Sequence, residues 1–133
     1  NISFTKPDFI DEWDEARVHH KDAFKDESDW LQKANDGKVF DITKVDSSID
    51  NTQYSNNCRK MQVEYNNLDN EKLQRVNDIF NAETIKIPLP IIRKKDNEYE
   101  CIAGNTRLTR MGIERCNDKS FPVMVWLIDL DKN

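Results

Sequence analysis

Gly104 constrains this chain most, because the sequence contains only three glycines and this one separates two predicted elements. Residues 98–103 alternate in a way that predicts a strand, and residues 108–111 are expected to form a short helix that Gly112 ends. A glycine at a strand-to-helix turn lets the backbone approach a ligand closely. The turn formed by residues 104–107 is therefore the first place to look for a binding site.

The turn itself has two interpretations. In one, the helix start offers unpaired N–H groups and the positive end of a dipole to a phosphate, and Arg107 adds a fork of donors. In the other, Gly104 only makes a tight turn, Asn105 or Thr106 caps the helix, and Arg107 lies on the surface. Short glycine motifs do not decide between the two.

Residues 1–37 are predicted to be helical. Proline at position 7 followed by acidic residues begins a first helix, whose apolar residues recur at helical spacing as far as Phe24. A second helix is expected from Asp29 to about Asp36, ended by Gly37 as a left-handed cap. The acidic residues of this region form either the solvated face of two helices or a surface that contacts a protein or mimics nucleic-acid charge.

The rest of the chain is expected to form one compact unit, residues 38–133. The expected elements are a strand at 39–42, an irregular segment at 43–66, a helix from a cap at Asn67 to Phe80, a strand at 87–92, a hairpin loop at 93–97, the strand at 98–103 and a buried strand at 121–128. An irregular segment as long as 43–66 inside such a small unit would be functional or mobile. We therefore predict an α+β fold: a small mixed sheet with packed helices, plus two N-terminal helices.

Charge argues against a protein that coats DNA by bulk electrostatics. The chain has 133 residues, enough for one domain with a real core, and a net charge of −5. Domains that bind DNA in this way tend to be basic. Local basic clusters at Arg59-Lys60, at residues 93–95, and at Arg107 and Arg110 leave a smaller basic groove open.

Cysteine and histidine do not assemble a metal site. The three cysteines are scattered and form no CxxC pair, which favours a reducing, cytoplasmic setting, or the host cytoplasm for a viral protein. His19 and His20 are adjacent, so on a helix they point about 100° apart and a structural or surface role is expected. No apolar run approaches the ~20 residues of a membrane helix, and the first residues do not resemble a signal peptide.

The second half of the chain resembles the ParB/sulfiredoxin-like superfamily, often called the ParB-like nuclease domain. The family pattern is a helix, a "P-I-x-V" strand, a hairpin, a strand that ends in "x-x-G-x-x-R" and opens a helix, and a "V-P-V" strand. The matching segments are Leu68–Phe80, Pro90-Ile91-Ile92, Tyr99–Leu108 and Phe121–Val125. The resemblance covers residues 67–128, extends loosely over 38–66 and leaves out 1–37.

This resemblance implies a site for nucleotide phosphates formed by Gly104, Asn105, Thr106 and Arg107. Members of the family bind and hydrolyse CTP, transfer phosphate to serine, repair oxidised cysteine with ATP, or are described as nucleases. Sulfiredoxins carry cysteine and histidine where this chain has Asn105 and Thr106, so their cysteine chemistry is not expected here. ParB proteins end the loop with two adjacent arginines, and the single Arg107 puts CTP specificity in doubt.

The resemblance also places a candidate base or metal ligand at Glu64, before the helix that precedes the "P-I" strand. Arg59 and Lys60 would reach the phosphates from the opposite side. Surface positions for these three side chains are the alternative. The expected ligand is a nucleoside triphosphate with Mg²⁺, which needs only one or two carboxylates besides the phosphates and leaves almost no sequence signature.

Two function classes therefore stay open. One is an enzyme of the ParB-like group that transfers or hydrolyses nucleotide phosphate, or cuts DNA, with catalytic roles for Glu64 and Arg107. The other is a non-catalytic module of the same fold that contacts a protein or nucleic-acid partner.

Overall fold

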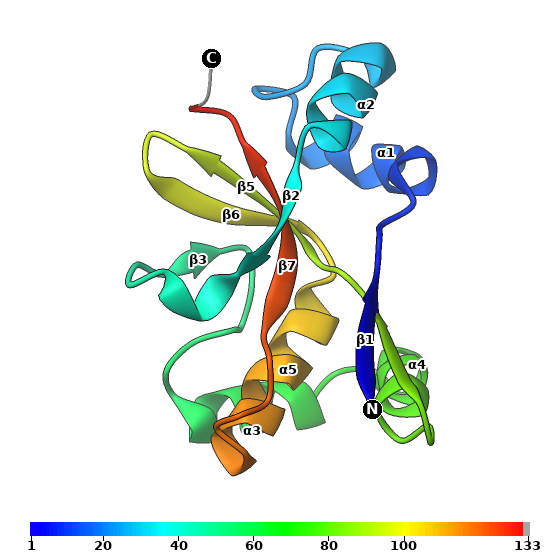
Figure 1. Cartoon of the computed structure of the whole chain (residues 1–133), viewed down its shortest axis with the longest axis vertical. Helices are drawn as coiled ribbons and strands as arrows, with labels where there is room; N and C mark the ends of the chain where they lie inside the picture. The colour runs from blue at the N-terminus through cyan, green and yellow to red at the C-terminus, as the bar shows by residue number, and fades with distance from the viewer. Residues whose placement is uncertain (132–133) are drawn as a thin grey trace.

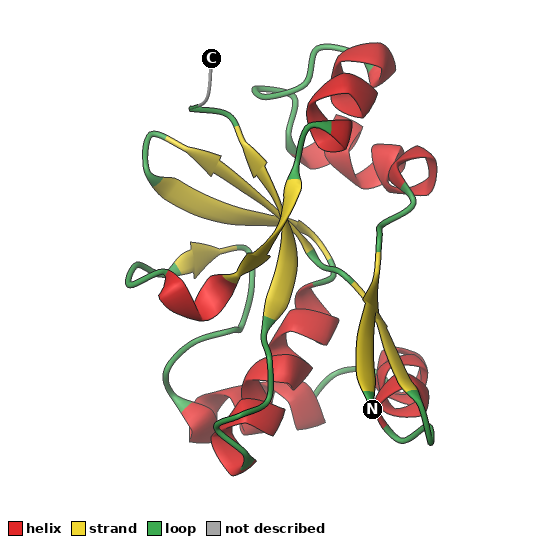
Figure 2. Cartoon of the chain, in the orientation of Figure 1, coloured by secondary structure: helices red, strands yellow, loops and turns green. Residues whose placement is uncertain are grey.

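A five-stranded mixed sheet forms the body of the molecule in the computed structural model, which describes residues 1–131 (Figure 1). The strand order is β2-β7-β5-β6-β3, with β5 parallel to β7 and antiparallel to β6. The strands are β2 (Lys38–Asp41), β3 (Ile49–Asp50), β5 (Ile91–Lys95), β6 (Glu98–Ala103) and β7 (Met124–Asp129). The predicted α+β class and mixed sheet are confirmed (Figure 2).

Helices cover both faces of this sheet. Alternate residues of the central strands enter different apolar clusters: Ile92 and Leu127 face one cluster, whereas Ile91 and Ile128 face the other. Burial of each such side chain contributes roughly 1.5–3 kcal/mol relative to exposure. The helices are α1 (Phe9–His19) and α2 (Glu27–Asn35) on one face, and α3 (Cys58–Asn66), α4 (Asn70–Phe80) and α5 (Asn105–Asn117) on the other, with a short 3-10 turn η1 at Ile42–Lys44.

A second, two-stranded sheet lies beside the main one. β1 (Ile2–Thr5) pairs in parallel with β4 (Ile85–Pro88). The helical expectation for residues 1–37 missed β1, and the single strand expected at 87–92 is divided between β4 and β5. Pro90 lies at the division, and its carbonyl accepts a hydrogen bond from the Trp126 amide at 2.8 Å. Proline has no N–H for a ladder, which is why the chain changes sheets here.

The N-terminal helices pack on the sheet through tryptophan. Trp30 is buried and its indole donates to the Phe9 carbonyl at 2.7 Å, while the Trp126 indole donates to the Ala34 carbonyl at 2.8 Å. A Cβ on Gly37 would collide with that Trp126 indole. Gly37 does not have a positive φ, so the predicted left-handed cap is wrong and close approach explains the glycine.

The first helix is shorter than expected. α1 ends at His19, because His20 leaves helical geometry with a φ of −131° and becomes buried. The chain then turns, and the Phe24 side chain packs edge-on against Trp30. The helical spacing that extended to Phe24 therefore reflected burial of these residues in one cluster rather than one continuous helix.

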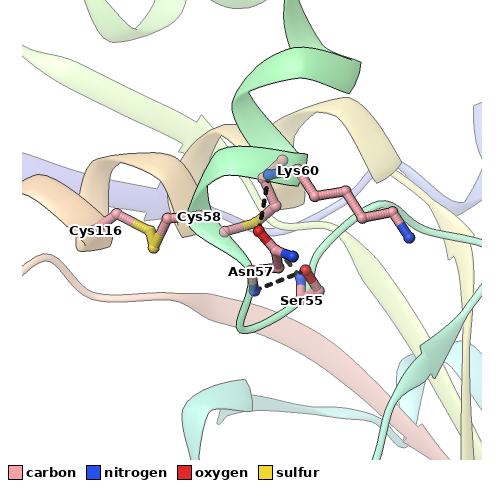
Figure 3. Close-up of a disulfide and its surroundings, with 6 residues drawn as sticks. Ser55, Asn57, Cys58, Lys60 and Cys116 are labelled. Carbon is pink, nitrogen blue, oxygen red and sulfur yellow. Dashed lines mark hydrogen bonds between the residues drawn. A yellow bond between two sulfur atoms is a disulfide. The ribbon is translucent and has the colours of Figure 1, made fainter.

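The segment predicted to be irregular contains α3. Asn57 caps this helix, but only Met61 and Tyr65 are buried, so its apolar periodicity is weak. Cys58 on α3 forms a disulfide with Cys116 on α5 (Figure 3). The sequence analysis did not predict this bond, because the cysteines are scattered and form no CxxC pair. Disulfides persist in oxidising compartments, so the bond also weighs against the reducing setting expected from the sequence.

Two helix boundaries also differ from expectation. α4 begins after Asp69, whose carboxylate accepts from the Lys72 amide, rather than at Asn67. α5 continues through Gly112 to Asn117, so the predicted end at Gly112 is wrong. Gly112 is instead a point of close packing, since a Cβ there would lie 2.8 Å from Tyr54.

No helix among residues 1–131 is both long and apolar enough to cross a membrane.

Candidate functional site

The glycine turn has the backbone conformation that only glycine adopts easily. β6 ends at Ala103 and α5 begins at Asn105, and between them Gly104 has φ 86° and ψ 24°, in the left-handed region. A Cβ at this position would lie 2.7 Å from Nη2 of Arg107 and 2.8 Å from the Cα of Pro90. Gly104 therefore allows both the turn and the position of the Arg107 side chain.

No side chain caps the N-terminus of α5. Each of the other four α-helices has an aspartate or asparagine that accepts hydrogen bonds from its first turn; these caps are Asp8, Asp26, Asn57 and Asp69. The first turn of α5 thus keeps N–H groups without a capping side chain, at the positive end of a helix dipole.

This helix start opens into a cavity of about 760 Å³, which we call the α5 cavity. Residues 104–107 form one wall, and side chains of α1 and α4 form others; the charged and imidazole side chains besides Arg107 are Glu12, Glu15, His19, His20, Lys72 and Arg75. The volume lies within the range of small-molecule sites. A ligand in this cavity would contact both the first turn of α5 and charged side chains.

Arg107 is a half-buried cation. Its Nε donates to the Pro88 carbonyl at 2.9 Å, and it makes no ion pair with a carboxylate among residues 1–131. Burial lowers the pKa of Arg107, and the nearby charge of Glu12 opposes this effect. Lys72 and Arg75, both exposed on α4, add positive charge at the same cavity. This part of the wall suits an anion.

Asn105 lines the cavity and also contacts a neighbouring loop. Its side-chain oxygen accepts from the Gln53 amide at 3.1 Å, and its side-chain nitrogen donates to the Gln53 side chain at 2.6 Å. Asn105 therefore holds the loop that precedes α3 against the start of α5. Thr106 is half-buried and lines the cavity.

The structure does not bring the other predicted residues to this cavity. Glu64, Arg59 and Lys60 all lie on α3, Glu64 half-buried and the two cations exposed, and none of them lines the α5 cavity. The disulfide holds the N-terminus of α3 to the far end of α5, at Cys116. Gly104, Asn105, Thr106 and Arg107 thus meet at one site, and the three residues of α3 stand apart from it.

Sequence reasoning missed the residues that α1 contributes. Glu12, Glu15 and His19 recur at helical spacing and line the cavity. Burial raises the pKa of Glu12, and the charge of Arg107 opposes this effect. Their spacing shows that the three share one side of a helix, but only the packing of α1 on the sheet shows what that side faces.

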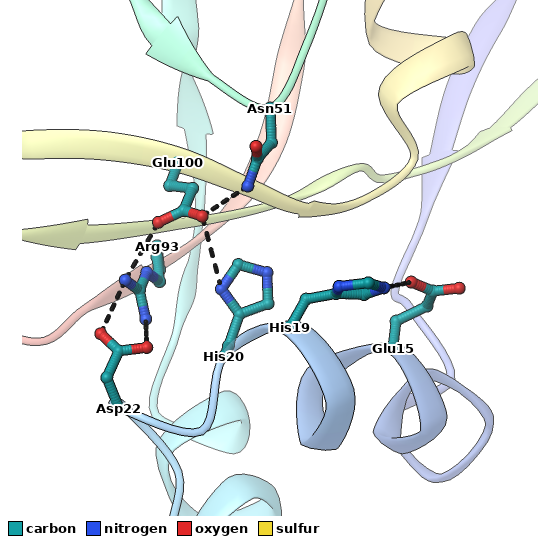
Figure 4. Close-up of polar contacts among 7 residues, drawn as sticks. All are labelled: Glu15, His19, His20, Asp22, Asn51, Arg93 and Glu100. Carbon is teal, nitrogen blue, oxygen red and sulfur yellow. Dashed lines mark hydrogen bonds and ion pairs between the residues drawn. The ribbon is translucent and has the colours of Figure 1, made fainter.

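Figure 4 shows a polar cluster, two residues of which, His20 and Asn51, line the cavity. Glu100 pairs with Arg93 at 3.0 Å, and Arg93 is held by both carboxylate oxygens of Asp22. Asn51, which lines the cavity in a left-handed conformation, donates to Glu100.

His20 is only 1% exposed, and its Nδ1 lies 3.8 Å from Glu100 without a hydrogen-bond partner. Burial lowers the pKa of His20, opposed by the charge of Glu100.

The remaining cysteine is not a nucleophile in this arrangement. Cys101 lines the cavity, but burial raises its pKa to about 12, so the thiolate is scarce near neutral pH. This supports packing as its role. Residues 1–131 contain no group of three or more His, Cys, Asp or Glu side chains placed to hold a metal ion.

Comparisons of the chain with protein-family models, with curated proteins and with solved structures found no match. The interpretation of the site therefore depends on its own geometry.

Proposed function

We propose that the α5 cavity binds the phosphate groups of a nucleotide, as the resemblance to ParB/sulfiredoxin-like domains implies. The first turn of α5 would supply backbone N–H donors, and Arg107 would supply charge-assisted hydrogen bonds. Lys72 and Arg75 lie where they could contact further phosphate oxygens. The cavity volume of about 760 Å³ leaves room for a base and sugar as well.

The observation that carries this proposal is the state of Arg107. A guanidinium that is partly removed from water commonly has a carboxylate partner, because desolvation of an unpaired charge is costly. Arg107 instead has one backbone carbonyl, beside an uncapped helix start. An anionic ligand would supply both the missing partner of Arg107 and the acceptors for the uncapped N–H groups of α5. This would account for the absence of protein partners at both places.

Magnesium would enter with a triphosphate rather than occupy a site of its own. In the part of the chain that the structure describes, no group of three or more His, Cys, Asp or Glu side chains could hold a metal ion by itself. The ion would therefore be held mainly by phosphate oxygens and water, and it would neutralise phosphate charge.

A non-catalytic module is the second candidate, and the position of Glu64 favours it. The base expected from the family position does not line the cavity. In that case the nucleotide would bind without turnover, and the acidic surface of α1 and α2 would contact a protein partner.

Calorimetric titration with ATP, CTP and GTP, each with and without Mg²⁺, tests the proposal. Arg107→Ala should weaken binding by about 1.5–3 kcal/mol, the loss expected for a charge-assisted contact. Arg107→Lys should restore only part of the affinity, because an ammonium lacks the planar fork. Arg59→Ala, the matched control on α3, should bind as wild type does. Equal affinity in wild type and Arg107→Ala would exclude a phosphate site at this residue.

A further inference from the structure

Glu12 lies on the wall of the α5 cavity that α1 provides. Phe9 and Ala16 are buried against the sheet, and Glu12, one turn from each, lies at the edge of that buried face and is itself half-buried. The packing of α1 therefore fixes where this carboxylate lies relative to the start of α5. The same cavity contains Arg107.

The two opposite charges do not touch. Each influences the other's protonation, yet no ion pair within 4.0 Å joins them, and the Glu12 carboxylate has no hydrogen-bond partner among residues 1–131. Half-buried neighbours of opposite charge gain energy by direct contact, unless the packing holds them apart. Here both side chains line the same cavity without pairing, so each is left to interact with a molecule bound in it.

Glu15 provides a contrast on the same helix. It also lines the cavity, but it is exposed and lies 3.7 Å from His19 (Figure 4). Water therefore screens the charge of Glu15, and its partner His19 is already present. Only Glu12 combines partial burial, a free carboxylate and proximity to Arg107.

We propose that Glu12 is the general base that activates water for hydrolysis of a nucleoside triphosphate whose phosphate is held by Arg107. This inference rests on the proposed function. The water oxygen forms a bond to the γ-phosphorus, and the bond from that phosphorus to the bridging oxygen breaks. The nucleoside diphosphate leaves with the bond pair, and the proton of the water passes to the Glu12 carboxylate. The proton later returns to solvent.

The surroundings of Glu12 suit this task. Burial makes a carboxylate a stronger base, since its charged form is less well solvated. Arg107 opposes that effect in the free protein. A bound phosphate would neutralise the charge of Arg107, so ligand binding itself would strengthen the base. In this proposal the general base of the enzyme comes from α1, a helix outside the segment that resembles ParB/sulfiredoxin-like domains.

The test is phosphate release from ATP, CTP and GTP with Mg²⁺, measured in wild type, Glu12→Gln and Glu15→Gln. Glu12→Gln should lower the turnover rate by about 100-fold or more, the usual contribution of a general base. Its nucleotide dissociation constant, measured by calorimetry, should stay within about threefold of wild type, since the base acts on the transition state. Glu15→Gln should keep near-normal turnover. Glu12→Asp, which retains a carboxylate, should be intermediate.

A second readout does not need turnover. The NMR signal of the Glu12 carboxyl carbon, titrated with pH, should shift to a higher midpoint when a non-hydrolysable ATP analogue is added. The Glu15 signal should move little. An unchanged Glu12 midpoint with the analogue bound would overturn the inference.

The outcomes separate the two proposals. A wild type that binds no nucleotide overturns the proposed function and this inference with it. A wild type that binds nucleotide but releases no phosphate overturns the inference alone and favours the non-catalytic module. Full turnover in Glu12→Gln, or an equal loss in Glu15→Gln, also overturns the role of Glu12. Thermal unfolding of each variant checks that it is folded.

Discussion

Arg107 and Arg110 lie one turn apart on α5, and their surroundings differ. Arg110 donates to Glu114, to the Tyr65 hydroxyl and to Asn77, and its guanidinium lies 4.8 Å from the centre of the Phe80 ring. Arg107, one turn earlier, makes a single hydrogen bond to a backbone carbonyl. The same residue type on one helix thus has several partners at position 110 and a single backbone partner at position 107, in the first turn.

The two ends of α5 also differ in how they are held. Near the C-terminus of α5, Cys116 is bonded to α3 and Arg115 donates to the Phe121 carbonyl at 3.1 Å. At the N-terminus, Gly104 provides no cap. Proteins depart from complete hydrogen bonding and pairing mainly at functional sites. We infer that the C-terminal end stabilises the fold and that the N-terminal end keeps its donors for a ligand.

Removal of the disulfide should produce the largest effect at the C-terminal end. The bond closes a loop between residues that are 58 apart in sequence. For a loop of that length, Cys58→Ser with Cys116→Ser should lower the free energy of unfolding by about 2–4 kcal/mol. Urea denaturation measures the loss. Nucleotide affinity should change far less than stability, since the bond is remote from the cavity.

A reductant supplies the control for this prediction. It should destabilise wild type by a similar amount and leave the double variant unchanged, because buried Cys101 forms no bond. If wild type and double variant unfold at the same urea concentration without reductant, the bond does not stabilise the native state.

Gly104→Ala should have the next largest effect, and at the opposite end. Alanine at φ 86° is strained, and its Cβ would press on the backbone of Pro90 and on Arg107. We expect a loss of about 2 kcal/mol in unfolding free energy, together with loss of nucleotide binding. Denaturation and calorimetry on one variant measure both.

Gly104→Asn separates the two causes, because asparagine tolerates left-handed angles but carries the same Cβ. If contact with Arg107 matters, this variant should recover part of the stability but little of the binding. Wild-type affinity in both variants would show that the turn is not part of a ligand site.

The elements that the sequence predicted well are those that local chemistry determines. β6 has the expected bounds, and Asp96 and Asn97 form the expected turn, with φ of 54° and 62°. β7 lies between β2 and β5, as its apolar residues indicated. By contrast, β1 exists only because β4 is beside it, and the Cys58–Cys116 bond depends on the packing of α3 on α5. Such tertiary contacts leave no local pattern.

The candidate site divides in the same way. Gly104 and Arg107 were accessible from sequence, because a rare glycine before a helix start has few explanations. Glu12 was not, since it comes from a helix that meets the turn only in the folded chain. The hydrogen bond from the Gln53 backbone N–H to the Asn105 side chain likewise depends on where the loop before α3 lies, and the sequence did not show this. Glu64 failed to reach the cavity for the same reason, since α3 is held elsewhere.

The smallest expected effect concerns His20, at the border of the cavity. Burial lowers its pKa below the ordinary 6.5, so the unfolded chain binds a proton that the folded chain resists. Stability from this group is therefore complete above pH 6.5 and falls as the pH drops toward the folded-state pKa, with a slope of at most about 1.4 kcal/mol per pH unit. Urea denaturation between pH 7.5 and about 5 should show this slope in wild type and in His19→Gln, whose residue is exposed, but not in His20→Gln. A slope that survives in His20→Gln would assign the pH dependence to carboxylates instead, and the border of the cavity would then contain no titrating histidine.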